Sequence, residues 1–365
     1  MEYLKKLIEY HPFEYDIDSR NNIFFHAVLE NFDHQLKNSH EYRNWSNVNH
    51  IYDSNDINSI EDIPFFPSSI FKYATLSSTQ TKFKSIESSG TTSQAKSKIY
   101  LDKENAKRQS TVLAKILSAI FGQKRKPFLI VDADIKSKKS DLELTARYAG
   151  MSGYLMAASK RNYILDKTND SLKLDINKLK RIIEDCNKKN ESVIIIGYTY
   201  LIYEKLLLKL KDEKSRLKCH KDTIFVHFGG WKKLKQKQIS KLELNSLINE
   251  YLGINEKNII DIYGFTEQLG TVYPSNGMGG CKVPAYSELI VRDTQTLRPV
   301  SDGELGFLQF ISPIAYSYPG LSILNDDLGK IVSREDNIIE FEVHGRPENS
   351  EPRGCGDTLP ENFLI

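Results

Sequence analysis

Four short and mostly apolar runs, each preceded by a stretch with helical periodicity, constrain the fold of this chain most strongly. The runs lack the alternation of a half-exposed strand, so they predict strands that are buried on both faces. Strands that alternate with amphipathic helices form mostly parallel sheets with helices on both faces. We therefore predict an α/β fold with strands at 128–131, 193–196, 223–226 and 259–262. Helices are expected at 102–122, 175–187, 199–212 and 238–251.

The pattern changes after residue 284. Strand-like segments at 289–291, 306–310 and 339–343 follow without helical periodicity, and the last of them alternates in polarity. We expect a β-rich lobe at about 284–345. With the preceding segments it would complete one large domain, residues 1–345, followed by a short tail, residues 346–365.

Bulk composition narrows the class of protein. Hydrophobic residues make up 40% of the 365 residues, which is enough for a substantial core. The 50 Lys and Arg residues nearly balance the 48 Asp and Glu residues, so no global basic excess indicates nucleic-acid binding. No apolar run reaches the roughly twenty residues that cross a bilayer, and no signal-peptide core follows Met1. We expect a cytoplasmic protein that does not span a membrane.

The four cysteines, Cys186, Cys219, Cys281 and Cys355, are widely spaced and form no C-x-x-C pair. Their spacing argues against structural zinc and against a disulfide framework, so we expect free thiols. Cys186 falls on an apolar stripe at helical spacing and is expected in the core. Cys355 differs, because glycines flank it and the nearby Arg353 favours the thiolate.

A run of glycine and hydroxyl residues is suited to binding phosphate. It comprises Ser88, Ser89, Gly90, Thr91 and Thr92, and Lys96 follows four residues later. Glycine lets successive backbone N–H groups point into one concavity, and the lysine adds a mobile cation. The run is not a Walker loop, because G-x-x-x-x-G-K-[ST] is absent. Alone, such a run is more often a polar turn.

Three later segments give this run a context. They are Tyr263-Gly264-Phe265-Thr266-Glu267, then Asp327-Leu328-Gly329-Lys330, then Gly345-Arg346. This ordered set resembles the adenylate-forming superfamily, in its phenylacetate-CoA ligase-like branch. The narrower likeness is to acyl-protein synthetases of the LuxE type, and it is carried by further stretches at 63–72, 197–199, 227–232 and 317–320. The resemblance implies the large N-terminal domain of that superfamily.

The resemblance also implies how ATP is held. Residues 88–92 and Lys96 would bind the β- and γ-phosphates, and Gly229 and Gly230 would border the purine. Tyr263 would lie against adenine with the backbone of Gly264 close by, Thr266 would bond the α-phosphate, and Glu267 would hold Mg²⁺. Asp327 would accept hydrogen bonds from the ribose hydroxyls, and Arg346 belongs to the same ATP-binding set.

This chain departs from the family pattern at several of these positions. The family usually has Gly where Ser93 stands and Pro where Ala95 stands. Its usual Thr-Gly-Asp is here Asn325-Asp326-Asp327, so Asp326 is a rival for the ribose contact. Only twenty residues follow Gly345, so the mobile C-terminal domain and its catalytic lysine are expected to be absent or vestigial.

Two residues are candidates for contacting the acyl group. His227 could contact the acyl carboxylate, although a buried structural histidine is an equal alternative. Cys355 matches the cysteine near the C-terminus that receives the acyl group in LuxE-type synthetases. Glu351 and Asp357 oppose the effect of Arg353 on its thiol, and an incidental exposed cysteine is the alternative.

We therefore expect an enzyme that uses ATP and Mg²⁺ to convert a fatty acid into acyl-AMP and then acylates Cys355. The resemblance implies a LuxC-like acyl reductase as partner, and an acyltransferase or an acyl carrier protein as further partners. One alternative is an acyl- or aryl-CoA ligase of the phenylacetate type. Another is a non-catalytic nucleotide- or acyl-binding subunit, because the catalytic lysine of the mobile domain is expected to be absent.

Overall fold

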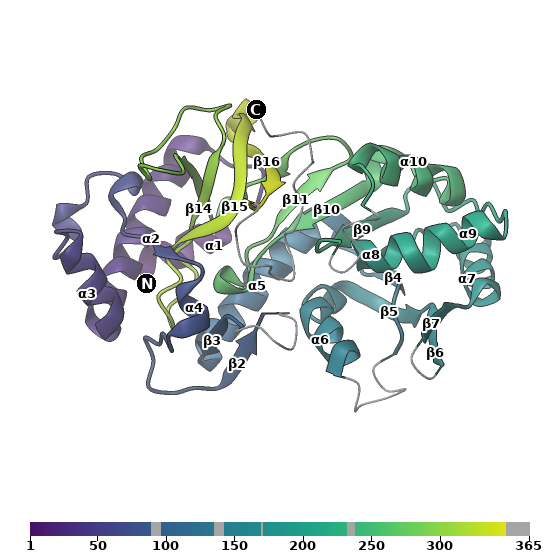
Figure 1. Cartoon of the computed structure of the whole chain (residues 1–365), viewed down its shortest axis with the longest axis horizontal. Helices are drawn as coiled ribbons and strands as arrows, with labels where there is room; N and C mark the ends of the chain where they lie inside the picture. Colours follow the sequence, from purple (N-terminus) through teal and green to yellow (C-terminus); the bar gives the residue numbers. More distant parts are fainter. Residues whose placement is uncertain (89–95, 135–141, 169–170, 232–237, 348–365) are drawn as a thin grey trace. The chain divides into compact units, whose positions relative to one another are not determined.

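The computed structural model describes residues 1–88, 96–134, 142–168, 171–231 and 238–347 (Figure 1). The chain forms two compact units. The first unit combines Met1–Ala119, Gly264–Tyr273 and Lys282–Ile365, and the second combines Ile120–Tyr263 and Pro274–Cys281. Among the described residues, no helix is both long enough and apolar enough to cross a membrane.

The second unit is built on parallel strands, as the apolar runs predicted. Neighbouring strands in the order β10, β9, β8, β4 and β5 pair in parallel. Their bounds are β4 Lys126–Ile130, β5 Ala158–Tyr163, β8 Ile194–Tyr198, β9 Ile224–Phe228 and β10 Ile259–Tyr263. Shorter strands are β6 Leu165–Thr168 and β7 Ser171–Leu174, which pair with each other, and β11 Tyr273–Asn276 and β12 Cys281–Lys282.

Helices cover both faces of this parallel sheet. Leu129, Ile195 and Phe225 of the strands belong to one buried cluster with Leu179 and Ile248 of the helices. The helices and turns of this unit are α6 Leu142–Met151, η4 Tyr154–Ala157, α7 Ile176–Lys188, α8 Thr199–Leu201, η5 Ile202–Leu207, α9 Leu208–Asp212, α10 Lys241–Leu252 and η7 Glu256–Asn258.

Neighbouring residues of a strand face opposite sides, so Phe128 lies on the face away from Leu129. There it makes an edge-to-face contact with Phe121, whose ring centroid lies 5.9 Å from its own. Phe121 is the last residue of α5 (Lys103–Phe121). The end of α5 therefore covers the second face, which confirms the predicted α/β arrangement.

The expected helix at 199–212 is present but irregular. It consists of α8, a π-helical segment η5 and α9 in succession. The predicted boundaries of α10 were slightly wrong at the start, because the Oγ atom of Ser240 accepts a hydrogen bond from the Glu243 N–H and caps the helix there. Gly253, with φ of +66°, ends it.

Antiparallel strands dominate the C-terminal part of the first unit, within the segment expected to be β-rich. The strands pair in the order β13, β14, β15, β16. Their bounds are β13 Glu288–Arg292, β14 Gly306–Ile311, β15 Ser322–Ser333 and β16 Glu340–Gly345. The short strand β1 (Phe66–Pro67) pairs in parallel with β15, and β2 (Lys84–Glu87) forms a hairpin with β3 (Lys98–Leu101).

Further helices near the N-terminus, which were not predicted from the sequence, complete this unit. They are α1 Glu2–Glu9, α2 Ile17–Asn38, α3 His40–Val48 and α4 Ile70–Tyr73, besides α5. Single-turn helices occur at η1 Ser54–Asp56, η2 Ile60–Asp62, η8 Thr266–Gln268 and η9 Glu335–Asn337.

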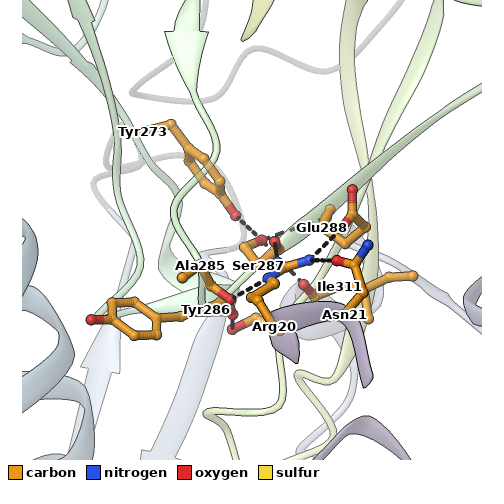
Figure 2. Close-up of polar contacts among 9 residues, drawn as sticks. Arg20, Asn21, Tyr273, Ala285, Tyr286, Ser287, Glu288 and Ile311 are labelled. Atoms are coloured by element: carbon orange, nitrogen blue, oxygen red, sulfur yellow. Dashed lines mark hydrogen bonds and ion pairs between the residues drawn. The ribbon is translucent and has the colours of Figure 1, made fainter. Parts of the chain in front are cut away.

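Arg20 of α2 ties these helices to the start of β13 (Figure 2). Its side chain is 2% exposed. The Nε atom donates to the carbonyl oxygen of Ala285 at 2.9 Å, and Nη1 donates to Glu288 Oε2 at 2.8 Å. Nη2 donates to the carbonyl of Ser287, whose hydroxyl lies 2.9 Å from that of Tyr273. One guanidinium group thus donates hydrogen bonds to two backbone carbonyls just before β13.

Candidate active site

Glu267, the candidate magnesium ligand, lies in the turn η8 of the first unit and is 4% exposed. The neighbouring Gln268 anchors the turn, because its Nε2 donates to the carbonyls of Phe310 at 2.9 Å and Gly320 at 3.0 Å. The backbone around Gly320 passes so close that an added Cβ would lie 2.9 Å from the carbonyl oxygen of Glu267. The carboxylate is therefore presented by a segment whose backbone position is fixed.

The turn is held from a second direction by α5. Gly270 has φ of +95°, and an added Cβ would lie 2.7 Å from Cα of Gln109. Gln109 Nε2 also donates to the hydroxyl of Tyr318 at 3.1 Å. Burial raises the pKa of Tyr318, with a smaller contribution from the charge of Glu267. Tyr318 and Glu267 thus belong to one buried polar cluster of the first unit.

The candidate ribose ligand, Asp327, forms a buried ion pair with Arg346. Asp327 is 2% exposed and Arg346 is 8% exposed. Nε of Arg346 donates to Oδ1 of Asp327 at 3.0 Å. The pairing of Leu328 with Gly345 brings the two residues together, because β15 and β16 are antiparallel. The sequence did not predict this contact, although it singled out both residues.

Asp326, the rival for the ribose contact, has a different environment. Successive strand residues face opposite sides, so Asp326 points away from the face that carries Asn325 and Asp327. It is half-buried, and its N–H donates to Oδ1 of Asn325 at 2.9 Å. The same Asn325 oxygen accepts from the hydroxyl of Ser68 at 3.4 Å. Asp327, on the other face, is the residue that pairs with Arg346.

The candidate phosphate loop connects β2 to β3. Ser88 N–H donates to the Ser97 carbonyl at 2.9 Å, and Ser97 N–H donates to Ser88 Oγ at 3.0 Å. These two bonds close the base of the loop. Lys96 is exposed next to this base. Ser89, Gly90, Thr91 and Thr92 lie outside the described residues, and so does Cys355.

His227 lies near the end of β9 in the second unit and is 3% exposed. In the parallel sheet it pairs with Gly197 of β8 on one side and with Asp261 of β10 on the other. Its Nδ1 lies 3.1 Å from Oγ1 of Thr199 and 3.5 Å from Oδ1 of Asp261. Its Nε2 is buried and has no hydrogen-bond partner among the described residues.

Burial lowers the pKa of His227, while the charge of Asp261 raises it and that of Lys241 lowers it further. The imidazole is therefore neutral at physiological pH. The sequence singled out His227 but missed Thr199 and Asp261 as its partners. The sequence places all three residues in or just after strands predicted to be parallel, but it does not say which of these strands are neighbours.

Aromatic rings surround the end of β9 within the same unit. The ring centroid of Phe228 lies 5.0 Å from that of Tyr154 and 4.7 Å from that of Tyr198. Gly229 has φ of +73°, and an added Cβ would lie 3.2 Å from Cδ1 of Tyr198, so a larger residue would be strained there. His227 and Phe228 are successive residues of β9, so these rings lie on the face of the sheet opposite to His227.

The predicted residues divide between the units as follows. The first unit holds Ser88, Lys96, Gly264, Thr266, Glu267, Asp327 and Arg346, and the second holds His227, Gly229, Gly230 and Tyr263. Within the first unit the structure joins Asp327 to Arg346. The described part of the chain contains no cluster of three or more His, Cys, Asp or Glu residues that could hold a metal ion. Within the described residues, Glu267 is therefore not part of an all-protein metal cage.

The fold is that of adenylate-forming ligases. A crystal structure of 2-hydroxyisobutyryl-CoA ligase in the postadenylation state, in complex with 2-HIB-AMP, matches with a TM-score of 0.64 at 12% identity, over 91% of this chain and 69% of that chain. An open conformation of the same ligase, in complex with 2-HIB-AMP and CoA, matches with a TM-score of 0.61 at 13% identity, over 91% and 76%. The predicted fold class is confirmed.

The family model described as "Acyl-protein synthetase, LuxE" matches residues 2–364, so the chain belongs to that family. The long-chain-fatty-acid–luciferin-component ligase of Aliivibrio fischeri is 25% identical over 355 residues, covering 94% of this chain and 89% of the relative. The ligase of the same name from Vibrio harveyi is 23% identical over 178 residues, covering 48% and 47%. These matches confirm the resemblance that the motifs indicated.

Proposed function

We propose that this protein joins a long-chain fatty acid to AMP at the expense of ATP and then transfers the acyl group to its own Cys355. The observation that carries the proposal is the family match, which extends over residues 2–364. The names of the two relatives, long-chain-fatty-acid–luciferin-component ligases, support the substrate class. The predicted site residues remain proposals that the geometry described above supports.

In the first half-reaction, a carboxylate oxygen attacks the α-phosphorus of ATP, and pyrophosphate leaves. The two anions must be brought together while the triphosphate charge is neutralised. Lys96, at the base of the β2–β3 loop, and Ser88 would act on the phosphates. Asp327 would accept from the ribose hydroxyls, because Arg346 holds its carboxylate in one orientation.

Glu267 fits the role of magnesium ligand. Magnesium in nucleotide sites is bound by one or two carboxylates together with substrate phosphates, and Glu267 is a buried single carboxylate on a fixed turn. When bound, the ion would neutralise phosphate charge. The contribution of the chain itself is to hold the carboxylate still, which Gln268 and Gly320 achieve.

In the second half-reaction, the sulfur of Cys355 attacks the carbonyl carbon of the acyl-AMP, the bond to the phosphate oxygen breaks, and AMP leaves. The thiol proton is lost to solvent. About ten residues separate Gly345 from Cys355, and an extended chain spans about 3.3–3.6 Å per residue, so the tail is long enough to cover some 30 Å. The thioester would then be passed to a partner, for which an acyl reductase or an acyl carrier protein is the proposed acceptor.

Carboxylate-dependent exchange between ATP and labelled pyrophosphate tests the first half-reaction. We expect exchange with long-chain fatty acids and none without a carboxylic acid. Absence of exchange with every acid would favour a non-catalytic nucleotide- or acyl-binding subunit. Exchange followed by acyl transfer to free coenzyme A, with no protein-bound acyl group, would favour an acyl-CoA ligase.

A further inference from the structure

The contacts of His227 determine which of its ring nitrogens carries the proton. The hydroxyl of Thr199 lies 3.3 Å from the carbonyl oxygen of Phe228, to which it donates its only hydrogen. The Thr199 oxygen can then only accept at Nδ1 of His227, 3.1 Å away. The carboxylate of Asp261, 3.5 Å from the same nitrogen, favours a proton there and would repel a lone pair. We assign the Nδ1–H tautomer.

The assignment leaves Nε2 with a lone pair and no hydrogen. Nε2 is buried and has no partner among the described residues, so it is a hydrogen-bond acceptor for which no donor is present there. An ionised carboxylate has no hydrogen to donate. Bringing a carboxylate against this nitrogen would place two lone pairs together in a buried site. The bare carboxylate is therefore the wrong partner for His227 in this state.

We propose that His227 binds the fatty acid together with one proton, which is shared between Nε2 and the substrate carboxyl group, and that Thr199 and Asp261 are positioning residues for this contact. The inference rests on the proposed function, because it takes the fatty acid to be the ligand of His227. The proton balance is simple. Free neutral imidazole and free carboxylate combine with one H⁺ from solvent, and the pair carries no net charge.

The charged groups around His227 determine whether a proton must be taken up to neutralise the substrate carboxylate. Asp261 on β10 has a 39% exposed side chain and already holds the Nδ1 side. Among the described residues, Lys241 on α10 is the cation whose charge acts on His227. Its ammonium group, however, donates to Ser275 Oγ at 3.1 Å and to the Gly279 carbonyl at 3.2 Å. These bonds direct Lys241 toward the turn after β11. In our proposal the negative charge of the substrate carboxylate is therefore balanced by the proton and not by Lys241.

Isothermal titration calorimetry measures the uptake directly. Decanoate is titrated into the full chain in the presence of α,β-methylene ATP, which prevents adenylation, at pH 8 in phosphate and in Tris. The difference in heat divided by the difference in buffer ionisation enthalpy gives the protons taken up. We expect about one proton per decanoate and an affinity that falls about tenfold per pH unit between pH 7.5 and 9, because the complex holds one more proton than its free components.

Two variants and one control complete the test. His227→Gln, which can donate a hydrogen bond, should bind decanoate with no proton uptake, and Asp261→Asn should reduce the uptake by lifting the preference for Nδ1–H. Asp222→Asn removes an exposed carboxylate of the same unit near His220 and should behave as wild type. Labelling histidine with ¹⁵N should show Nε2 of His227 unprotonated before decanoate is added.

The outcomes separate this inference from the proposed function. Decanoate binding and pyrophosphate exchange without proton uptake would overturn the inference and assign charge neutralisation to a cation such as Lys241. A wild-type protein that neither binds decanoate nor supports exchange would overturn the proposed function together with the inference. Proton uptake that is unchanged in His227→Gln would overturn the inference but not the proposed function.

Discussion

Arg346 Nε lies 3.0 Å from Asp327 Oδ1, and both side chains are buried although each could carry a full charge. A buried charge without a partner costs several kcal/mol, so each residue depends on the other. Arg346 directly follows β16, at the point where the C-terminal tail begins. The pair therefore fixes the backbone just after β16 and orients the proposed ribose ligand at the same time.

The ribose assignment predicts that Asp327→Asn weakens ATP binding more than Asp326→Asn does. Loss of a buried ribose contact leaves polar groups unpaired and costs about 1–3 kcal/mol, which is about a fivefold to 150-fold loss in affinity. Titration calorimetry with ATP measures it, and thermal melts identify any loss of folding. The reverse order of effects would move the ribose role to Asp326.

The phosphate assignment predicts that Lys96→Ala and Glu267→Gln each slow carboxylate-dependent pyrophosphate exchange by about 10²-fold, the usual effect of removing one electrostatic contact to the reacting group. Lys98→Ala and Glu335→Gln are matched controls, since one changes a partly exposed lysine on β3 and the other an exposed carboxylate of the same unit. Exchange at the wild-type rate in both site variants would contradict the assignment.

The Arg20 network predicts a large effect on stability. Arg20→Leu leaves the carbonyls of Ala285 and Ser287 and the carboxylate of Glu288 without their buried donor, so we expect a loss of about 3–5 kcal/mol in the free energy of unfolding. Arg334→Leu breaks an exposed pair with Asp302, both about half exposed, and should cost about 0–1 kcal/mol. Urea denaturation compares them, and equal losses would refute the anchoring role of Arg20.

Burial should make the described cysteines slow to react. It raises the pKa of the Cys219 thiol to about 12 and also raises that of Cys186. Alkylation requires the thiolate, so at pH 8 almost none of the Cys219 thiol is reactive, and its rate should rise as the pH approaches 12, while Cys186 should react more slowly than an exposed thiol. Peptide mass spectrometry after brief iodoacetamide treatment of the native protein measures it. Complete labelling of Cys219 within minutes at pH 8 would contradict the buried environment.

The parallel part of the fold could be predicted because buried strands have a simple signature. The runs at 128–131 and 223–226 became β4 and β9 with shifts of one or two residues. The strand β15 was missed because Asn325, Asp326 and Asp327 interrupt its apolar pattern. Buried strands are expected to be apolar, and polar residues within them often belong to functional sites. A prediction that relies on apolar runs misses such strands.

The candidate site could be predicted by residue type but not by contact. The motifs singled out His227, Asp327 and Arg346, whereas the partners Thr199 and Asp261 follow only from the register of neighbouring strands. Register depends on how side chains pack across strands, and a single sequence does not display that packing. The same limit explains why the pairing of Asp327 with Arg346 was not anticipated.

Intact-protein mass spectrometry after incubation with ATP, Mg²⁺ and a long-chain fatty acid tests the central claim most directly. The account predicts one hydroxylamine-labile acyl adduct on the wild-type protein, located at Cys355. Cys355→Ser should lose the adduct while keeping fatty-acid-dependent pyrophosphate exchange, because adenylation needs no thiol and an unactivated serine is a much weaker nucleophile. An adduct of undiminished yield on Cys355→Ser, or one located on Cys186, Cys219 or Cys281 in the wild-type protein, would contradict self-acylation at Cys355.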